Sequence, residues 1–285
     1  MPELPEVEVL KRHLAPVLRG KTIREVRALR SKVLAPTSPG EFVRTLSGAT
    51  FVNLSRRGKY LRFELRAATG KEKIQLTGHL GMTGRMYLLP VAALLPKHAA
   101  VVFDLGREKF VFEDTRYFGR LTLEPGATDK LGPEPLGDDF TVAYLRSALK
   151  RSTQAIKVRL LDQALVAGIG NIYASEALFR AGISPRRAAR RLTGEQVARL
   201  RRSIRATLTE AIARGSTVPL NYSGSGERDG LFYFGGPGGD GADFYEERLR
   251  VYDRAGGECP KCGSTIRRFV QAARSTFYCP RCQRG

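Results

Sequence analysis

Hydrophobic positions change their spacing twice along this chain of 285 residues. Val7, Leu10, Leu14 and Val17 share one face at helical spacing, which predicts a helix over residues 3–18. The next hundred residues hold short segments rich in β-branched and aromatic residues, separated by Gly or Pro, as is typical of a compact β-sandwich or barrel. The predicted strands are residues 22–29, 50–54, 60–65, 73–76, 100–105, 109–113 and 121–123.

A turn-rich stretch, residues 124–137, contains three prolines and three glycines and is the best candidate for an interdomain linker. Helical spacing returns after it and predicts helices over residues 141–149, 153–166, 172–181 and 194–214. The last of these opens with the capping-box pair Thr193 and Gln196. The pattern therefore predicts an α+β chain of more than one domain.

Two glycine-containing segments stand out in the second half. Gly168 and Gly170 precede Asn171, which we interpret as the N-cap of a helix whose N-terminus suits a phosphate; a plain interhelical turn explains these residues equally well. Residues 222–241 are rich in glycine and poor in aliphatic residues. Such a stretch is typical of a mobile loop, either a lid over an active site or a disordered insert.

Charge indicates the kind of partner. The chain has 48 Lys and Arg residues against 28 Asp and Glu, and its net charge of +20 predicts attraction to a polyanion, most simply nucleic acid. A membrane surface is the competing polyanion, but no apolar run approaches the ~20 residues that span a bilayer. No signal-peptide pattern opens the chain, so we expect a cytosolic protein.

Four cysteines, Cys259, Cys262, Cys279 and Cys282, have the spacing C-x2-C-x16-C-x2-C. This spacing is typical of a four-thiolate zinc site, whereas the alternative, disulfide bonds, is disfavoured in a reducing compartment. Such a site is structural because four thiolates leave no open position for water. No acidic residue lies between Cys259 and the end of the chain, so we expect this zinc finger to bind phosphate.

The N-terminus carries candidate chemistry. Removal of Met1 would expose Pro2 as a secondary amine beside the carboxylates of Glu3 and Glu6. An α-amino group titrates near ~8 and lysine near ~10.4, so the terminal amine is more often in its nucleophilic form at neutral pH. Such an amine can attack an electrophilic sugar carbon and form a Schiff base. A helix start, with Pro5 in the first turn, explains the same residues without any chemistry.

Six motifs and the zinc finger occur in a fixed order. The motifs are Pro-Glu-Leu-Pro-Glu-Val-Glu at 2–8, Arg-Gly-Lys-Tyr at 57–60, His-Leu-Gly-Met-Thr-Gly-Arg at 79–85, Asp-Thr-Arg-Tyr-Phe-Gly at 114–119, Leu-Gly-Pro-Glu-Pro-Leu at 131–136 and Ala-Gly-Ile-Gly-Asn-Ile-Tyr-Ala-Ser-Glu-Ala-Leu-Phe at 167–179. In this order and spacing the whole chain resembles the bacterial formamidopyrimidine-DNA glycosylase family.

The resemblance implies a domain organisation. We expect an N-terminal β-sandwich catalytic domain with an N-terminal helix over residues 1–130 and a helical helix–two-turn–helix DNA-binding domain over 138–220. A flexible glycine-rich loop over 221–248 and a C-terminal zinc-finger β-hairpin over 249–285 would follow. One structural zinc ion is the implied cofactor.

The resemblance also implies an activity. Enzymes of this family are bifunctional base-excision enzymes that flip an oxidised purine, such as 8-oxoguanine or a formamidopyrimidine, out of duplex DNA. They cleave the glycosidic bond and then break the strand by β,δ-elimination. The implied partner is double-stranded damaged DNA, and the implied state is a monomer. The implied location is the bacterial cytoplasm, with association to the nucleoid through DNA binding.

Five residues match the catalytic positions of the family. Pro2 would attack C1′ and carry the Schiff base, Glu3 would protonate the opening deoxyribose, and Glu6 would stabilise the developing positive charge. Lys59 matches the lysine that assists β-elimination and contacts phosphate, although without the motif it is an ordinary solvated hairpin lysine. Arg274 matches the finger arginine that helps δ-elimination.

Further residues match the family's DNA contacts. Met82, Arg116 and Phe118 would fill the void left by the flipped base, as a flexible thioether, a donor to the orphaned cytosine and an aromatic wedge. Core packing is the alternative for Met82 and Phe118. The further phosphate contacts implied are His79, His98, Lys150, Arg151 and Asn171.

The chain departs from the family pattern in three places. Ala99 and Ala100 follow His98 where the family usually has Asp and His, Tyr117 replaces a second arginine, and the glycine-rich loop is longer. Base preference is therefore the least transferable property. One alternative is an endonuclease VIII-like enzyme for oxidised pyrimidines. Leu4, the Met82 motif and the pair Arg116 and Phe118 argue against it. A non-catalytic zinc-finger DNA-binding protein is the other, but it gives no reason for Pro2 and Glu3 to coexist with Lys59.

Overall fold

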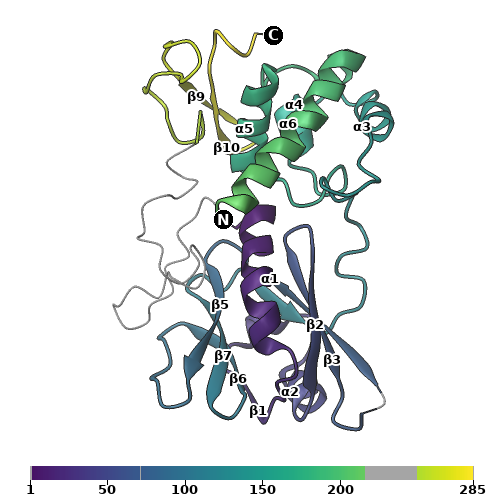
Figure 1. Cartoon of the computed structure of the whole chain (residues 1–285), viewed down its shortest axis with the longest axis vertical. Helices are drawn as coiled ribbons and strands as arrows, with labels where there is room; N and C mark the ends of the chain where they lie inside the picture. Colours follow the sequence, from purple (N-terminus) through teal and green to yellow (C-terminus); the bar gives the residue numbers. More distant parts are fainter. Residues whose placement is uncertain (1, 71, 216–248, 285) are drawn as a thin grey trace. The chain divides into compact units, whose positions relative to one another are not determined.

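The computed structural model of the chain describes residues 2–70, 72–215 and 249–284 (Figure 1). Residues 6–129 form an N-terminal unit, with which Pro2 is grouped; residues 3–5, 130–215 and 249–284 form a C-terminal unit. The boundary between the units falls inside the turn-rich stretch 124–137. The glycine-rich stretch 222–241 lies outside the described residues, so its interpretation as a lid or an insert stays a prediction.

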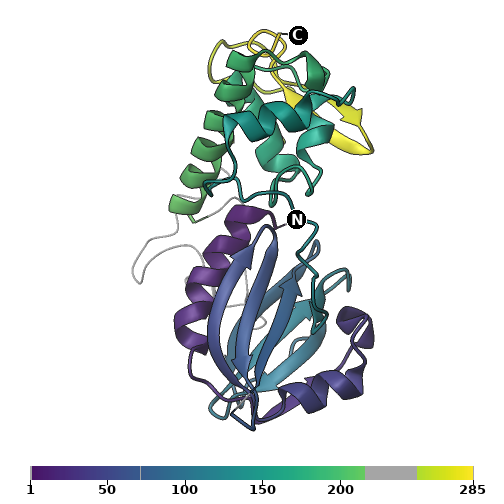
Figure 2. The same cartoon turned by 90° about the vertical axis from the view of Figure 1, so that its right-hand side faces the viewer.

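The N-terminal unit is a sandwich of two antiparallel four-stranded sheets, drawn as two layers in Figure 2. One sheet has the order β1-β6-β7-β5 and the other β2-β3-β4-β8. The strands are β1 (Glu25–Ala28), β2 (Thr50–Arg57), β3 (Tyr60–Arg66), β4 (Lys73–His79), β5 (Gly84–Pro90), β6 (Ala99–Asp104), β7 (Glu108–Asp114) and β8 (Arg120–Thr122). Three helices accompany them: α1 (Leu4–Leu18), the 3-10 helix η1 (Ser31–Leu34) and α2 (Pro39–Leu46). The predicted β-sandwich with an N-terminal helix is confirmed.

Aromatic rings fill the space between the sheets. The rings of Phe51, Phe63, Phe103 and Phe110 are neighbours, with centroids 5.6 to 6.4 Å apart. The apolar face of α1 belongs to the same core, but Val17 is 40% exposed and Leu18 is buried in its place. Burial along α1 thus follows the i+4 step from Leu14 to Leu18.

Several elements differ from the sequence prediction. No strand was predicted over β5, whose Gly84 and Pro90 are atypical strand ends, and no helix over α2, although Ser38 caps it and Pro39 opens it. β2 and β4 extend beyond their predicted ends through polar residues. Their last residues, Arg57 and His79, both pair with Tyr60 of β3, so ladder pairing and not hydrophobicity sets these boundaries.

The C-terminal unit contains helices and one hairpin. They are α3 (Val142–Leu149), α4 (Ile156–Leu160), α5 (Asn171–Ala181), the 3-10 helix η2 (Ala189–Arg191), α6 (Gly194–Ala213), β9 (Arg267–Gln271) and β10 (Arg274–Tyr278). The predicted capping box of α6 is confirmed, because both of its hydrogen bonds are present. The prediction of one helix over residues 153–166 is wrong. Only α4 is helical there, because Ala155 forms a β-bridge with Ala188 and Ile156 N–H donates to the carbonyl of Arg187 at 2.7 Å.

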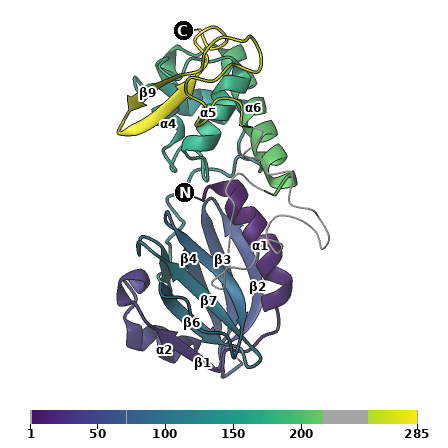
Figure 3. The same cartoon turned by 90° about the vertical axis from the view of Figure 1, so that its left-hand side faces the viewer.

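The zinc-finger hairpin packs on α5, as Figure 3 shows. Phe179 of α5 shares a small core with Val251, Ile266 and Phe277. The turn between β9 and β10 consists of Ala272 and Ala273, with φ angles of 48° and 57°. Two consecutive positive φ angles are typical of a type I′ turn, which places Arg274 at the tip of the hairpin.

Candidate functional site

Glu3 lies at the N-terminus of α5, where its carboxylate accepts backbone hydrogen bonds. The N–H of Gly170 donates to Oε2 at 2.6 Å, that of Ile172 to Oε1 at 2.9 Å and that of Tyr173 to Oε2 at 3.4 Å. The first turn of a helix has unpaired N–H groups and a positive dipole end, so this position suits a carboxylate. Because Glu3 directly follows Pro2 in the chain, these hydrogen bonds from α5 hold its carboxylate one residue from the predicted nucleophile.

The two glycines before α5 permit this approach. A Cβ on Gly170 would lie 2.3 Å from Cδ of Glu3, and one on Gly168 would lie 2.7 Å from Cβ of Leu4. The interpretation of Asn171 as the N-cap is wrong, because Gly170 is the N-cap and Asn171 is the first helical residue. Glu3, and not a phosphate, takes the N–H groups of this first turn.

Lys157 joins α4, α5 and the zinc-finger hairpin. Its Nζ donates to Oδ1 of Asn171 at 2.6 Å, to the carbonyl of Ser275 at 2.9 Å and to Oγ1 of Thr276 at 2.7 Å. Asn171 Nδ2 donates to the same Ser275 carbonyl at 3.0 Å. We did not predict a role for Lys157 from the sequence; the available signal was a lysine between the apolar residues Ile156 and Val158.

The charges around Lys157 are mixed. Burial and the positive charge of Arg274 lower the pKa of Lys157 to about 8, while the negative charge of Glu3 acts in the opposite direction. Burial raises the pKa of the Tyr252 hydroxyl; its hydrogen bond with Asn171 lowers it and the Glu3 charge raises it. These five residues, Glu3, Lys157, Asn171, Tyr252 and Arg274, therefore form one polar group, which we call the α5 cluster.

The four cysteines meet at one point of the finger. Their Sγ atoms all lie within 4.8 Å of one another, with Cys259 to Cys282 at 3.8 Å and Cys262 to Cys279 at 3.5 Å. A tetrahedral zinc ion with Zn–S bonds of ~2.3 Å requires sulfur atoms ~3.8 Å apart, so the donor set fits this ion. All four ligands are thiolates, and the ion they hold is structural.

Two further side chains, Glu176 and Arg186, contact the finger from the rest of the C-terminal unit. Glu176 of α5 accepts hydrogen bonds from the backbone N–H groups of Arg250 at 3.0 Å, Val251 at 2.9 Å and Tyr252 at 2.8 Å. Burial raises the pKa of Glu176, and the three backbone hydrogen bonds oppose this shift. The guanidinium of Arg186 stacks over the Phe269 ring, 4.0 Å from its centroid. The segment leading into the finger thus depends on a buried carboxylate that sequence analysis did not identify.

In the N-terminal unit, Lys59 follows Gly58 in the turn between β2 and β3 and is 8% exposed, unlike a solvated hairpin lysine. His79, at the end of β4, packs against Tyr60 with ring centroids 4.7 Å apart. Its Nδ1 accepts the N–H of Gly81 at 3.1 Å. Burial, followed by the charges of Lys59 and Arg120, lowers the pKa of His79 to about 4. His79 is therefore a neutral imidazole at physiological pH, with Nε2 left as a donor.

Met82, Arg116 and Phe118 meet at the surface of the N-terminal unit. Arg116 Nη1 donates to Sδ of Met82 at 3.3 Å, and its guanidinium lies 4.6 Å from the centroid of the Phe118 ring. Met82 is 45% and Phe118 46% exposed, so the core-packing alternative is wrong for both. We call these three residues the wedge group.

Asp114 holds the two turns that carry the wedge group. Its carboxylate accepts from the N–H groups of Arg116 at 3.1 Å and Gly119 at 2.7 Å, and from Oγ1 of Thr83 at 2.5 Å. The turns approach so closely that a Cβ on Gly81 would lie 2.6 Å from the backbone nitrogen of Gly119. A buried carboxylate thus positions the exposed arginine and both apolar side chains.

Tyr117, which departs from the family pattern, has local partners. Arg30 Nε donates to its hydroxyl at 3.2 Å, and the Arg30 guanidinium lies 5.6 Å from the centre of its ring. The His98 ring lies 6.4 Å from the same ring. Arg30 therefore returns a positive charge to the position where an arginine is replaced.

Comparison with known proteins shows which family this arrangement represents. Residues 1–121 match the family model described as the formamidopyrimidine-DNA glycosylase N-terminal domain, residues 131–221 the H2TH domain of the same enzymes, and residues 256–285 the zinc finger found in FPG and IleRS. A formamidopyrimidine-DNA glycosylase of Carboxydothermus hydrogenoformans is 42% identical over 284 residues, with all of both chains covered. The chain belongs to the formamidopyrimidine-DNA glycosylase family.

Solved structures agree with this assignment. The Lactococcus lactis FPG mutant G226P in complex with Fapy-dG containing DNA is 32% identical, covers all of both chains and has a TM-score of 0.87. MutM in complex with carbocyclic 8-oxo-G containing DNA is equally identical, with a TM-score of 0.86 and full coverage of both chains. Our chain is accordingly a DNA glycosylase of base excision repair, and the predicted family, fold and enzyme class are confirmed.

The remaining predicted site residues of this glycosylase are divided between the two units. Pro2 and Glu6 are grouped with the N-terminal unit, and both are buried. Lys150 is the C-cap of α3, and Arg151 follows it; both are exposed in the C-terminal unit. In the parts of the glycosylase that the structure describes, no helix combines the length and apolar content needed to cross a bilayer.

Proposed function

We propose that this glycosylase excises oxidised purines, such as 8-oxoguanine and formamidopyrimidines, from duplex DNA and then cleaves the strand at the resulting abasic site. The position of Glu3 carries the proposal. Removal of Met1 makes Pro2 the chain terminus with a free amine, and the next residue, Glu3, has a carboxylate that three backbone N–H groups hold in place. A carboxylate held beside the attacking amine can stabilise the positive charge that develops on the sugar during the reaction.

The steps follow from the chemistry of the terminal amine. The lone pair of the Pro2 nitrogen attacks C1′, and the bond from C1′ to the base breaks with its electron pair leaving on the base. The attack leaves a proton on the Pro2 nitrogen. The Glu3 carboxylate takes this proton and gives it to O4′ as the sugar ring opens, which leaves an iminium between C1′ and Pro2. Loss of a proton from C2′ expels the 3′ phosphate, with Lys59 assisting, and a second elimination assisted by Arg274 expels the 5′ phosphate. Glu6 stabilises the iminium charge.

DNA binding is assigned to both units. The wedge group replaces the flipped base in the stack, and Arg116 donates to the base left opposite. His79, His98, Lys150, Arg151 and Asn171 contact phosphates, His79 as a neutral donor. The zinc ion keeps the finger folded, and Arg274 is presented by its hairpin. The enzyme acts as a monomer in the bacterial cytoplasm on nucleoid DNA.

The proposed domains are residues 1–130, 138–220 and 249–285, joined through residues 221–248. Domain 1–130 supplies the amine and the wedge group, 138–220 the scaffold of the α5 cluster and 249–285 the finger arginine. This division predicts that a fragment of residues 1–130 keeps the sandwich but has no lesion-dependent DNA binding. Circular dichroism and a binding assay on that fragment test it.

Borohydride trapping tests the nucleophile. The mature enzyme should give a covalent adduct with an 8-oxoguanine duplex, mapped by mass spectrometry to Pro2, whereas a form that retains Met1 should give none and still bind a duplex with an abasic analogue. An adduct on Lys59 in the Met1-retaining form would reject Pro2 as the nucleophile. Cleavage of duplexes containing 8-oxoguanine, formamidopyrimidine, thymine glycol or an abasic site decides between purine and pyrimidine lesions.

A further inference from the structure

Among the residues that the structure describes, no strand lies beside the first part of β4 on one side. β3 pairs with all of β4, whereas β8 pairs only with Thr77–His79. The N–H of Ala67 donates to the carbonyl of Glu72 across the β3–β4 turn, and alternate pairs of an antiparallel ladder exchange hydrogen bonds. Counting from that pair, the backbone groups of Lys73 and Gln75 point away from β3, toward the open edge.

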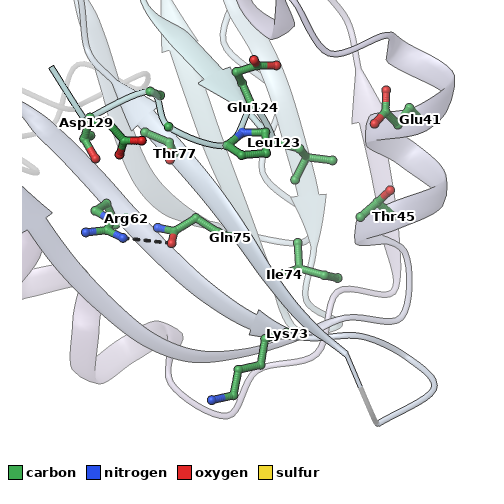
Figure 4. Close-up of a pocket in the computed structure, with 14 residues that line it drawn as sticks. Glu41, Thr45, Arg62, Lys73, Ile74, Gln75, Thr77, Leu123, Glu124 and Asp129 are labelled. Atoms are coloured by element: carbon green, nitrogen blue, oxygen red, sulfur yellow. Dashed lines mark hydrogen bonds between the residues drawn. The ribbon is translucent and has the colours of Figure 1, made fainter.

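The course of the chain after β8 explains why this edge is open. Oγ1 of Thr37 lies 2.9 Å from Oγ1 of Thr122, and it accepts the N–H of Leu123 at 3.0 Å. These contacts draw the chain away from β4 after three paired residues. The space that remains is a cavity of about 450 Å³. In Figure 4, Glu41 and Thr45 of α2 lie on one side of it and Arg62 and Asp129 on the other.

The lining of this cavity has unpaired polar groups. Gln75 Oε1 accepts from Arg62 at 3.1 Å, but Gln75 Nε2 is buried and has no hydrogen-bond partner in the described parts of the chain. Glu41, Glu124 and Asp129 also line the cavity, and none of them forms an ion pair with a residue that the structure describes. A buried amide without a partner costs free energy, and a ligand that accepts from it would remove that cost.

We propose that this β4 edge binds an extended polypeptide segment of a partner protein by β-strand addition, with a lysine or arginine of that segment reaching Glu41, Glu124 and Asp129. An open edge supplies alternating donors and acceptors that an added strand satisfies, and side-chain pockets then give specificity. Arg62 and Lys73 also line the cavity, but the three carboxylates outnumber these cations and form no ion pair within the described residues, so the lining favours a basic segment. A second copy of the chain is disfavoured as the occupant, because each copy carries a net charge of +20.

The test uses NMR titration of the full-length, isotope-labelled enzyme with three synthetic peptides. The first is acetyl-Thr-Val-Lys-Val-Thr-amide, the second has Glu in place of Lys, and the third is the Lys peptide with N-methylated backbone nitrogens. The Lys peptide should shift the amides of Lys73 and Gln75 and slow their hydrogen exchange. The Glu peptide should bind about fivefold more weakly, and the N-methylated peptide should not bind.

A charge-reversing variant sharpens the test. Glu124→Lys should reverse the preference between the Lys and Glu peptides, whereas the control Glu25→Lys, on exposed β1, should leave it unchanged. Absence of shifts at residues 73–77 with about 1 mM Lys peptide would overturn the proposal, as would an unchanged preference in Glu124→Lys. A dimer in sedimentation that Lys73→Pro dissociates would assign the edge to a second copy and also overturn it. Glycosylase activity should be the same in every variant.

Discussion

Nζ of Lys157 and Oδ1 of Asn171 lie 2.6 Å apart, and both side chains donate to the carbonyl of Ser275 in the zinc-finger hairpin. Through this contact α4 and α5 hold the same point of the finger, one residue after Arg274. The position of the finger arginine is therefore coupled to the protonation and geometry of Lys157.

The first prediction concerns the charge of Lys157. Because its pKa is lowered from 10.5 to about 8, DNA affinity should fall as pH rises through 8, when Nζ loses its charge and one donor. Binding of an abasic-analogue duplex measures this without involving the Pro2 amine in chemistry. In Lys157→Gln, which cannot titrate at this position, the fall in affinity between pH 7 and pH 9 should be smaller, and the Pro2 amine, which titrates near ~8, accounts for the remainder. An equal pH dependence in both proteins would exclude Lys157 as its source.

The free energy of unfolding should depend on the Lys157 proton in the opposite sense to DNA affinity, increasing as pH rises. The unfolded chain keeps the Lys157 proton up to about pH 10.5, whereas the folded chain releases it near pH 8. Between these values the unfolded state binds more protons, so the free energy of unfolding gains a positive contribution as pH rises. The difference between wild type and Lys157→Gln in urea titrations, taken at pH 7 and pH 9, isolates that contribution from other groups.

The second prediction concerns Gly170. An alanine there would place Cβ 2.3 Å from Cδ of Glu3, so Gly170→Ala should displace the carboxylate and reduce single-turnover excision by ~10²-fold. Gly137→Ala is the matched control, because its Cβ would meet only ordinary contacts, 3.4 Å from Glu134. Both proteins should bind zinc normally. Wild-type excision by Gly170→Ala would show that the position of Glu3 is not required.

Contacts within one helix could be predicted from the sequence of this chain, whereas contacts between distant residues could not. Local sequence patterns predicted the α6 cap and the α1 face, except for Val17, because both features depend on neighbours within one helix. Glu3 and Gly170 are 167 positions apart, so no local pattern reveals that one carboxylate occupies the helix end that we assigned to a phosphate. Lys157 was missed for the same reason, since its acceptors lie on α5 and in the finger.

The wedge group shows the opposite case. Composition favours core packing for Met82 and Phe118, yet Asp114 holds both turns so that the two side chains are exposed. The family motif predicted the three residues, but only the structure brings Arg116 into contact with both. Exposed apolar side chains that cluster around one arginine indicate a binding surface, whereas single exposed apolar side chains do not.

The third prediction follows from that contact. Arg116→Ala removes the donor to the base opposite the lesion, and it should weaken binding to a lesion duplex by about 1–3 kcal/mol and relax the preference for the opposite base. Arg107→Ala removes an equal charge at an exposed turn between β6 and β7. It should lower affinity for all opposite bases alike. If both variants lose the same affinity for every opposite base, Arg116 is a nonspecific phosphate contact.

The fourth prediction concerns the attachment of the finger. Glu176 is buried and accepts three backbone N–H groups from residues 250–252, so Glu176→Ala leaves these donors unpaired and should release the finger from α5. Removal of zinc should also disrupt the finger, in this case by unfolding it, because four thiolates hold a hairpin whose own core is small. Both changes should abolish binding of lesion DNA while the β-sandwich stays folded.

Hydrogen exchange separates the two causes. In Glu176→Ala with zinc bound, amides of residues 250–252 should lose protection while those of β9 and β10 keep it, because the thiolates still close the finger. In the zinc-free wild type, β9 and β10 should lose protection first. The exposed Arg180–Glu210 ion pair, 2.9 Å long, provides the control, since Glu210→Ala removes a carboxylate contact from α6 without touching the finger. If Glu210→Ala disturbs residues 250–252 as strongly as Glu176→Ala, the buried carboxylate has no special role as an anchor.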